Sequence, residues 1–242
     1  MIYSVGSIFL DHIIKINSFP KKPVKVFAKG IEKRLGGSAA VASFTIKKLG
    51  INTAFIGRFG DDDVSKSLKG ELKKFKINYN DSVIIKGAQS SQSYVYEDKD
   101  GERLLAAFNE KKLLNNKKLP KISFIKNTTF ITDLRWIEAT LYIAKNCHKK
   151  NLIHVVDLDN YKLTSQIKKI VHLASHPIFS ETGALEFTKS KSIINSLKQM
   201  HSIKNKFYAI TAGKKGVYWI ENGIIFNCRP PAIKVIETNC AG

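Results

Sequence analysis

Segments with the pattern of a β-strand alternate with segments that have the pattern of an α-helix along most of this 242-residue chain. Parallel strands need a crossover connection, usually a helix that covers one face of the sheet. The alternation therefore predicts an α/β protein with a mostly parallel sheet between helices. Strands are predicted at Ile2–Phe9, Thr53–Phe59, Thr128–Thr132, Ile153–Asp157, Pro177–Ser180 and Phe207–Thr211, and helices at Ser38–Leu49, Ile137–Lys149, Gln166–Ala174 and Leu185–His201.

Other segments depart from this rhythm and predict β-hairpins, because short strand-like runs flank turn sequences rich in Asp, Asn and Gly. Together with an irregular stretch at Val24–Leu35, which is expected to supply edge strands, the first hairpin predicts a small β lid from residues 12–35 and 92–107. No linker interrupts the chain, so residues 1–242 are expected to form one domain. The hairpins are Ser93–Glu97 with Arg103–Ala107, and Val217–Ile220 with Ile224–Cys228.

Composition excludes several classes of protein. No apolar run reaches the ~18 residues that span a bilayer, and the first residues have the pattern of a strand rather than of a signal peptide. Cys147, Cys228 and Cys240 are odd in number and far apart. This spacing argues against a disulfide framework or a zinc site and fits a reducing compartment. We expect a cytoplasmic protein without a membrane partner.

The net charge of +20, from 40 Lys and Arg against 20 Asp and Glu, raises the alternative of a polyanionic partner. The lysines are dispersed through helical stretches, no block of five or six basic residues occurs, and no nucleic-acid motif accompanies them. We therefore interpret the charge as solvated helix faces rather than as a nucleic-acid surface.

Two features near the N-terminus suit a polar ligand. Gly36 and Gly37 precede a predicted helix, so the backbone can approach a ligand without a Cβ clash, at a helix N-terminus that favours polar or anionic groups. Asp11 follows the first strand, and a carboxylate accepts two hydroxyl hydrogen bonds at once, which suits a vicinal diol. The alternatives are a tight strand–helix turn for the glycines and a turn cap for Asp11.

Two further sequences complete an ordered set. Thr211-Ala212-Gly213-Lys214-Lys215-Gly216 lies between two predicted strands, and Glu237-Thr238-Asn239-Cys240-Ala241-Gly242 follows a strand-like run. With Gly36-Gly37 they resemble, in this order, the motifs of the ribokinase / phosphofructokinase-B (PfkB) carbohydrate kinases, whose later motifs are T-x-G-x-x-G and D-T-x-G-A-G-D. Alone, the Thr211–Gly216 sequence is also compatible with a plain β-turn.

The resemblance implies a ribokinase-like three-layer α/β/α sandwich with a β lid, and ATP-dependent phosphorylation of a sugar hydroxyl with Mg²⁺. It assigns the sugar to Asp11, Gly36 and Gly37, and the nucleotide to Thr211, Gly213 and Gly216. Glu181 alone matches the family's Asn-Glu-x-Glu, which orders the water shell of Mg²⁺. An anion hole for the transferred phosphoryl group is implied at Asn239, Cys240, Ala241 and Gly242.

The final motif departs from the family pattern in two ways. Glu237 stands at the first Asp position, and the sequence ends at Gly242, where the family continues with its catalytic Asp. The resemblance therefore leads us to expect that the chain as given is C-terminally incomplete and inactive.

The family usually has an Asn in its glycine motif, at the position where this chain has Val41. The sulfofructose kinase branch of the family lacks this Asn as well, and the chain resembles that branch. Asp133-Leu134-Arg135-Trp136 carries this likeness, and it implies that Arg135, Asn109 and Lys25 recognise a sulfonate on the sugar. An Arg fork with an ammonium and an amide suits a tetrahedral anion. The alternative is that Arg135 and Lys25 are surface cations and Asn109 a turn residue.

Two other functions stay open at this point. The chain is alternatively a non-catalytic relic of the fold that binds a sugar or nucleotide, or a basic nucleic-acid binder. Because lids of the family sometimes pair, a homodimer through the lid is a further expectation.

Overall fold

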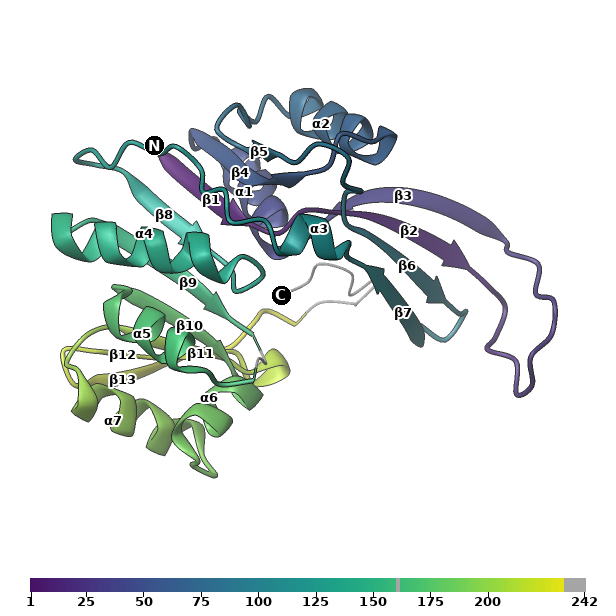
Figure 1. The fold of residues 1–242 in the computed structure, drawn as a ribbon. Coiled ribbons are helices and arrows are strands. Elements are labelled where there is room, and N and C mark those ends of the chain that lie inside the picture. The colour runs from purple at the N-terminus through teal and green to yellow at the C-terminus, as the bar shows by residue number, and fades with distance from the viewer. Residues whose placement is uncertain (160–161, 233–242) are drawn as a thin grey trace. The chain divides into compact units, whose positions relative to one another are not determined.

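The computed structural model describes residues 1–159 and 162–232 (Figure 1). The contacts among these residues divide the chain into two compact units. The sheet unit contains Met1–Gly6 and the described residues from Lys121 onwards, and the lid unit contains Ser7–Pro120.

The sheet unit is built on parallel strands that follow one another in space in chain order. Parallel pairing joins β1 to β8, β8 to β9, β9 to β10 and β10 to β11, and antiparallel pairing then adds β12 and β13. The strands are β1 (Ile2–Gly6), β8 (Thr129–Thr132), β9 (Ile153–Leu158), β10 (His176–Ser180), β11 (Tyr208–Thr211), β12 (Val217–Glu221) and β13 (Ile224–Cys228).

Helices connect the parallel strands and cover one face of this sheet (Figure 1). Alternate strand residues such as Val156, Leu158 and Phe179 are buried in a core with Ile170 and Leu197 from the helices. The mostly parallel sheet with helical crossovers confirms the α/β fold that the sequence predicts. The helices are α4 (Ile137–Lys150), α5 (Ser165–Leu173), α6 (Glu181–Thr188) and α7 (Ile193–Ile203).

The hairpin at the edge of the sheet confirms another prediction. Strands β12 and β13 are joined through Asn222 and Gly223, whose φ angles are 50° and 79°. Positive φ at both central positions is the type I′ pattern that matches the twist of a two-residue hairpin.

One predicted helix of the sheet unit is wrong. The segment Leu185–His201 forms parts of two helices, because Lys189 has a left-handed φ of 54° that ends α6. Ser192 then accepts a hydrogen bond from the Asn195 N–H and starts α7 as its N-cap. Five polar residues, Thr188-Lys189-Ser190-Lys191-Ser192, lie at the junction of the two helices.

The lid unit contains a four-stranded sheet, which we call the lid sheet, in the order β3-β2-β6-β7. Strand β2 is antiparallel to β3 and parallel to β6, and β6 forms the predicted hairpin with β7. Strands β4 and β5 form a parallel pair, and β4 packs against α1. The elements are β2 (Phe9–Lys15), β3 (Gly30–Gly36), α1 (Ser38–Lys48), β4 (Thr53–Phe59), α2 (Asp63–Lys74), β5 (Val83–Ile84), β6 (Gln92–Glu97), β7 (Arg103–Phe108) and α3 (Lys111–Leu114).

The first predicted strand, Ile2–Phe9, is also wrong as a single element. β1 ends at Gly6, and β2 begins at Phe9 as part of the lid sheet. A Cβ atom at Gly6 would lie 2.4 Å from Asp133 Oδ1, so the strand end has room only for glycine. The apolar run thus supplies strands to two different sheets.

Asp62 fixes the start of α2 and the approach to β6 at the same time. Its Oδ1 accepts hydrogen bonds from the Ser65 N–H at 2.9 Å and the Ser90 hydroxyl at 2.7 Å. Its Oδ2 accepts the Ser90 N–H at 2.9 Å, and Ser90 Oγ in turn accepts the Gly60 N–H at 3.0 Å. Asp62 is thus the N-cap of α2, and it also holds a segment 28 positions further along the chain.

We predict that Asp62→Ala lowers the free energy of unfolding by about 2–4 kcal/mol, because it removes an N-cap and charge-assisted hydrogen bonds. Asp63→Ala is the matched control, since the Asp63 side chain is 93% exposed and pairs only at the surface with Lys66. Urea unfolding measures both variants. Equal destabilisation by the two changes would contradict the role given to Asp62.

Candidate active site

Asp11 lies at the centre of the lid sheet between two neighbouring strands. It is opposite Arg34 on β3 and opposite Ser93 on β6. The Ser93 hydroxyl donates a hydrogen bond to Asp11 Oδ1 at 2.5 Å. The predicted pair of Asp11 and Gly36 is brought together, because a Cβ atom at Gly36 would lie 2.0 Å from Asp11 Oδ2. Gly36 has no left-handed φ, so the carboxylate alone requires a residue without a side chain here.

Two opposing effects act on the Asp11 carboxyl group. Burial raises the pKa of Asp11 above its ordinary value, because it disfavours the ionised form. The Ser93 hydrogen bond and the neighbouring His12 act in the opposite direction and lower this pKa. A half-buried carboxylate with room for further hydrogen bonds is a suitable acceptor for polar hydroxyls.

The Asp11 side chain opens into a cavity of about 610 Å³ within the lid unit. This volume is in the range of small-molecule sites. One wall is apolar, with Val41 and Phe44 from α1 and Phe75 from α2, and the rings of Phe44 and Phe75 meet edge to face at 4.4 Å. Cationic side chains, Lys33, Arg34 and Arg103, line the same cavity.

Glu32 neutralises part of that positive charge. Its two carboxylate oxygens lie 2.6 Å from Lys15 Nζ and 2.6 Å from Arg34 Nη2. The hydrogen bonds from Lys15 and Arg34 lower the pKa of Glu32. Arg34 is therefore held along β3 by an acidic neighbour.

The other predicted substrate residues of the lid unit lie at different places. Gly37 is the N-cap of α1, and a Cβ atom there would lie 2.7 Å from the Ser7 carbonyl oxygen. Asn109 Oδ1 accepts a hydrogen bond from the Ser91 hydroxyl at 2.8 Å, just after β7. Lys25 lies in the exposed β2–β3 connection, with its Nζ 4.9 Å from the ring centroid of Phe27. Lys25 and Asn109 are not among the residues that line the cavity.

Arg135, the third residue of the predicted anionic pocket, belongs to the sheet unit. Its backbone N–H donates a hydrogen bond to Asp133 Oδ1 at 2.9 Å, and its side chain is exposed. The Asp133 carbonyl accepts the Thr140 hydroxyl at 2.6 Å, which ties the end of β8 to α4. The turn that presents Arg135 is thus well held.

The predicted nucleotide turn follows β11 and contains a short 3₁₀ helix, Gly213–Lys215. The Ala212 N–H donates to the Gly216 carbonyl at 2.8 Å, and the Thr211 hydroxyl donates to the Phe179 carbonyl at 3.3 Å. Gly216 has a φ of 92°, and a Cβ atom there would lie 2.0 Å from the Cys228 carbonyl oxygen. Only glycine fits at position 216, whereas the space beside Gly213 is open.

Glu181 and the nucleotide turn are joined by an ion pair. Glu181 is the first residue of α6, directly after β10, and its Oε1 lies 2.7 Å from Lys215 Nζ. This pair raises the pKa of Lys215. Glu181 is therefore next to the turn that is predicted to carry nucleotide phosphates.

Among the residues that the structure describes, too few ligands lie near Glu181 for the protein alone to hold a metal ion. Gly183 stands where the family pattern has a second Glu. In the described part of the chain, no three His, Cys, Asp or Glu side chains gather as metal ligands. Glu181 can therefore support Mg²⁺ only as a single carboxylate, next to an ion that the nucleotide phosphates hold.

Residues 1–159 and 162–232 include no helix that is long and apolar enough to cross a membrane.

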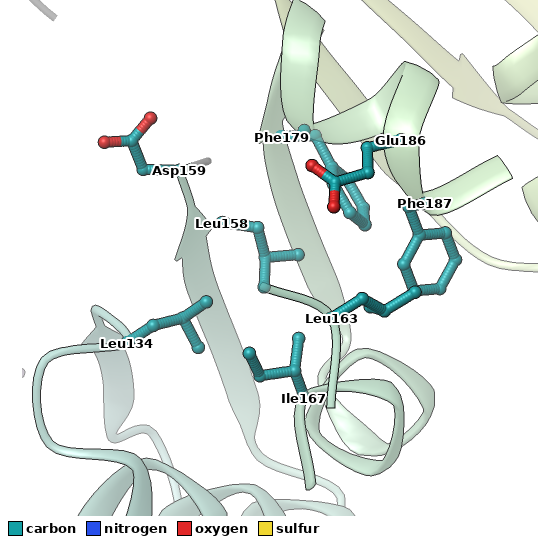
Figure 2. A pocket seen from close by; sticks show the side chains of 9 residues that line it. Leu134, Leu158, Asp159, Leu163, Ile167, Phe179, Glu186 and Phe187 are labelled. Atoms are coloured by element: carbon teal, nitrogen blue, oxygen red, sulfur yellow. The ribbon is translucent and has the colours of Figure 1, made fainter. Parts of the chain in front are cut away.

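A smaller recess in the sheet unit is a packing gap. Figure 2 shows Leu158 and Phe179 from β9 and β10 facing Ile167 and Phe187 from the helices. Its volume is about 20 Å³, enough for little more than one water molecule. It does not serve as a substrate site.

The predicted anion hole, Asn239, Cys240, Ala241 and Gly242, lies outside the described residues.

Comparison with known proteins gives the family. The pattern described as "pfkB family carbohydrate kinase" matches residues 1–242. The chain is 25% identical to the nucleoside kinase of Methanocaldococcus jannaschii over 98% of its own length and 78% of that protein. A shorter stretch, 31% of the chain and 23% of the relative, is 39% identical to probable fructokinase-5 of Arabidopsis thaliana.

Solved structures agree with this result. The crystal structure of the M. jannaschii nucleoside kinase superposes with a TM-score of 0.82 at 20% identity, over 99% of this chain and 80% of that one. Arabidopsis thaliana ribokinase, complexed with ribose and ATP, superposes with a TM-score of 0.78 at 17% identity, over 99% and 81%. The fold is ribokinase-like, and the chain belongs to the pfkB family of carbohydrate kinases.

The sequence interpretation missed the groups that surround Asp11. Ser93 contacts the carboxylate, and Arg34 and Arg103 line its cavity, but none of the three belongs to a sequence motif. Period-two alternation places Ser93 on one face of its strand. The sequence carries no signal for which residue of another strand lies opposite it.

Proposed function

We propose that this chain binds the hydroxyl groups of a sugar or nucleoside through Asp11, as the acceptor for ATP-dependent phosphorylation of the pfkB type. The supporting observation is the half-buried Asp11 carboxylate, which opens into a cavity of ligand size while Ser93 and Gly36 hold its position. Membership of the pfkB family gives the class of reaction.

Each group has a role in this proposal. Asp11 accepts hydrogen bonds from two neighbouring hydroxyls and so orients the sugar. The Thr211–Gly216 turn contacts the nucleotide, and Lys215 beside Glu181 supplies positive charge near its phosphates. Glu181 would support a Mg²⁺ ion held mainly by the ATP phosphates, and such an ion would supply positive charge to the transferred group. The Asn239–Gly242 run, as the family pattern has it, supplies backbone N–H groups to the same charge.

The apolar wall of the cavity bears on which kind of substrate the site accepts. Val41 replaces the Asn that the family pattern places in this helix, and Phe44 and Phe75 extend the apolar surface. This wall and the likeness to a nucleoside kinase favour a substrate that carries an apolar or aromatic ring. The shorter likeness to a fructokinase keeps a ketose as the second candidate.

A ketose with a sulfonate or phosphate is the finer form of the second candidate. It requires that Arg135, Asn109 and Lys25 meet around one anion, with the Arg135 guanidinium as the bidentate donor. The exposed Arg135 side chain and the ordered turn beneath it support this assignment.

We also propose that two copies pair through the lid sheet. Ile31, Tyr96 and Leu104 share one face, because Ile14 lies opposite Ile31 and Tyr96, and Tyr96 lies opposite Leu104. Their exposed fractions are 67%, 36% and 58%. Such a row of apolar side chains is typical of an interaction surface.

Two alternatives compete with a kinase. A relic of the fold would bind a sugar or nucleotide without turnover, and a basic nucleic-acid binder would use the net charge of +20 instead of the cavity. For the relic, sugar binding still depends on Asp11, but no phosphate is transferred. For the nucleic-acid binder, the affinity for a nucleic acid falls steeply with salt concentration and does not change when Asp11 is replaced.

We predict that Asp11→Asn weakens binding of the preferred ligand among ribose, fructose and inosine by about tenfold to a hundredfold, measured by calorimetry. The free energy of unfolding of this variant at pH 7 should be unchanged or higher. The pKa of Asp11 is raised in the folded unit, so its ionised form destabilises the fold at neutral pH, and this destabilisation disappears as the pH falls and Asp11 is protonated. Asp63→Asn, at an exposed site, is the control. Undiminished binding by the Asn variant would refute the proposed role of Asp11.

For the anionic ketose, Arg135→Ala should lower the affinity for the charged sugar by about tenfold to a hundredfold and leave the neutral ketose nearly unaffected. Lys145→Ala, an exposed cation of the same unit, is the control. The measured quantity is the ratio of the affinities for the charged and the neutral ketose. If this ratio is unchanged in the Arg135 variant, the proposal of an anionic substrate is wrong.

For the lid dimer, Leu104→Lys should convert the dimer to a monomer in sedimentation velocity, because a charge would be buried in the interface. Ile84→Lys, at a 49% exposed site on β5, should not. A monomeric wild-type chain at micromolar concentration would rule out the dimer.

A further inference from the structure

Ser93 is a buried side chain that contacts the Asp11 carboxylate. Only 3% of its surface is exposed, and its hydroxyl lies 2.5 Å from Asp11 Oδ1. A buried hydroxyl needs a hydrogen-bond partner, and here the carboxylate accepts that bond. The other oxygen, Oδ2, lies over Gly36, where no Cβ atom blocks it.

We propose that Ser93 is a positioning residue that holds the Asp11 carboxylate in one orientation, so that its remaining acceptor positions face the sugar hydroxyls. This inference rests on the proposed function, in which Asp11 binds the sugar. Without the Ser93 bond, the carboxylate can rotate about its χ angles, and part of the binding free energy is spent on ordering it.

The register of β6 places Ser93 opposite Asp11. The Asp62 carboxylate holds Ser90 through its N–H and its hydroxyl, and the Leu10 N–H donates to the Ser91 carbonyl at 3.1 Å. These bonds fix the chain just before β6 begins at Gln92. A slip of one residue would turn the Ser93 side chain to the other face of the lid sheet.

Several charged groups neighbour Asp11 or line the cavity into which it opens. His12 is its neighbour on β2, Lys33 and Arg34 come from β3 with Glu32 paired to Arg34, Arg103 comes from β7, and Glu71 comes from α2. Lys15 balances the second oxygen of Glu32. None of these groups changes when Ser93 is altered, so a change in the titration of Asp11 reports the lost hydroxyl.

Loss of the hydroxyl has a predictable sign. The Ser93 bond favours the ionised carboxylate and lowers the pKa of Asp11 against the effect of burial. Ser93→Ala should therefore raise the pKa of Asp11, and sugar binding should fail at a higher pH on acidification than in the wild type.

The experiment compares Ser93→Ala and Ser93→Thr with Ser43→Ala in the full chain. Ser43 is also a fully buried serine of the lid unit, but its hydroxyl donates to the Ala40 carbonyl at 2.7 Å. Carbon-13 NMR follows the Asp11 carboxyl resonance from about pH 4 to 8, assigned through Asp11→Asn. Calorimetry over the same range measures the affinity for ribose, fructose and inosine.

We expect Ser93→Ala to raise the Asp11 midpoint and to weaken sugar binding at pH 7 by about twofold to tenfold, the range of a single hydrogen bond. Ser93→Thr should restore both quantities, and Ser43→Ala should change neither. An unchanged Asp11 midpoint in Ser93→Ala overturns the inference, whether or not any of the three probes binds.

The two proposals fail in different ways. If Asp11→Asn abolishes binding while Ser93→Ala binds as the wild type does, the positioning role is wrong and the proposed function stands. If Asp11→Asn leaves the affinity for a bound probe unchanged, the proposed function is wrong, and the positioning role falls with it.

Discussion

The candidate site depends on one interaction, the hydrogen bond that holds a half-buried carboxylate between two strands of the lid sheet. Burial of Asp11 disfavours its ionised form, and the Ser93 hydroxyl opposes that effect at 2.5 Å. Gly36 supplies the space that the carboxylate occupies. An acidic group kept in such a place lowers stability at neutral pH, which is a common property of functional residues.

The nucleotide side rests on a different constraint, the geometry of parallel strands. Carboxyl ends of parallel strands lie along one edge, so β10 and β11 bring Glu181 and the Thr211–Gly216 turn together. The Ala212 N–H to Gly216 carbonyl hydrogen bond closes the turn, and the carbonyl oxygen of Cys228 leaves no room for a side chain at Gly216. An exposed ion pair, Glu181 with Lys215, then places a cation where phosphate is expected.

Local signals in the sequence predicted much of the fold. The strand Thr53–Phe59 and the hairpin turned at Asn222-Gly223 are confirmed because propensity and turn chemistry act over a few residues. The break at Gly6 lies within a largely apolar run that reads as one strand, whereas the break at Lys189 lies in the polar stretch Thr188–Ser192. The contact between Asp11 and Ser93 spans 82 positions and depends on strand register. Propensity and periodicity do not specify register between distant strands.

The most direct test of the account is a crystal structure of the chain with its bound sugar or nucleoside. We predict that two neighbouring hydroxyl oxygens lie within about 2.5–3.0 Å of the Asp11 carboxylate oxygens, as O–H···O hydrogen bonds require, and that Ser93 retains its bond to Oδ1. A ligand bound elsewhere, with Asp11 contacting no hydroxyl group, would contradict the central claim.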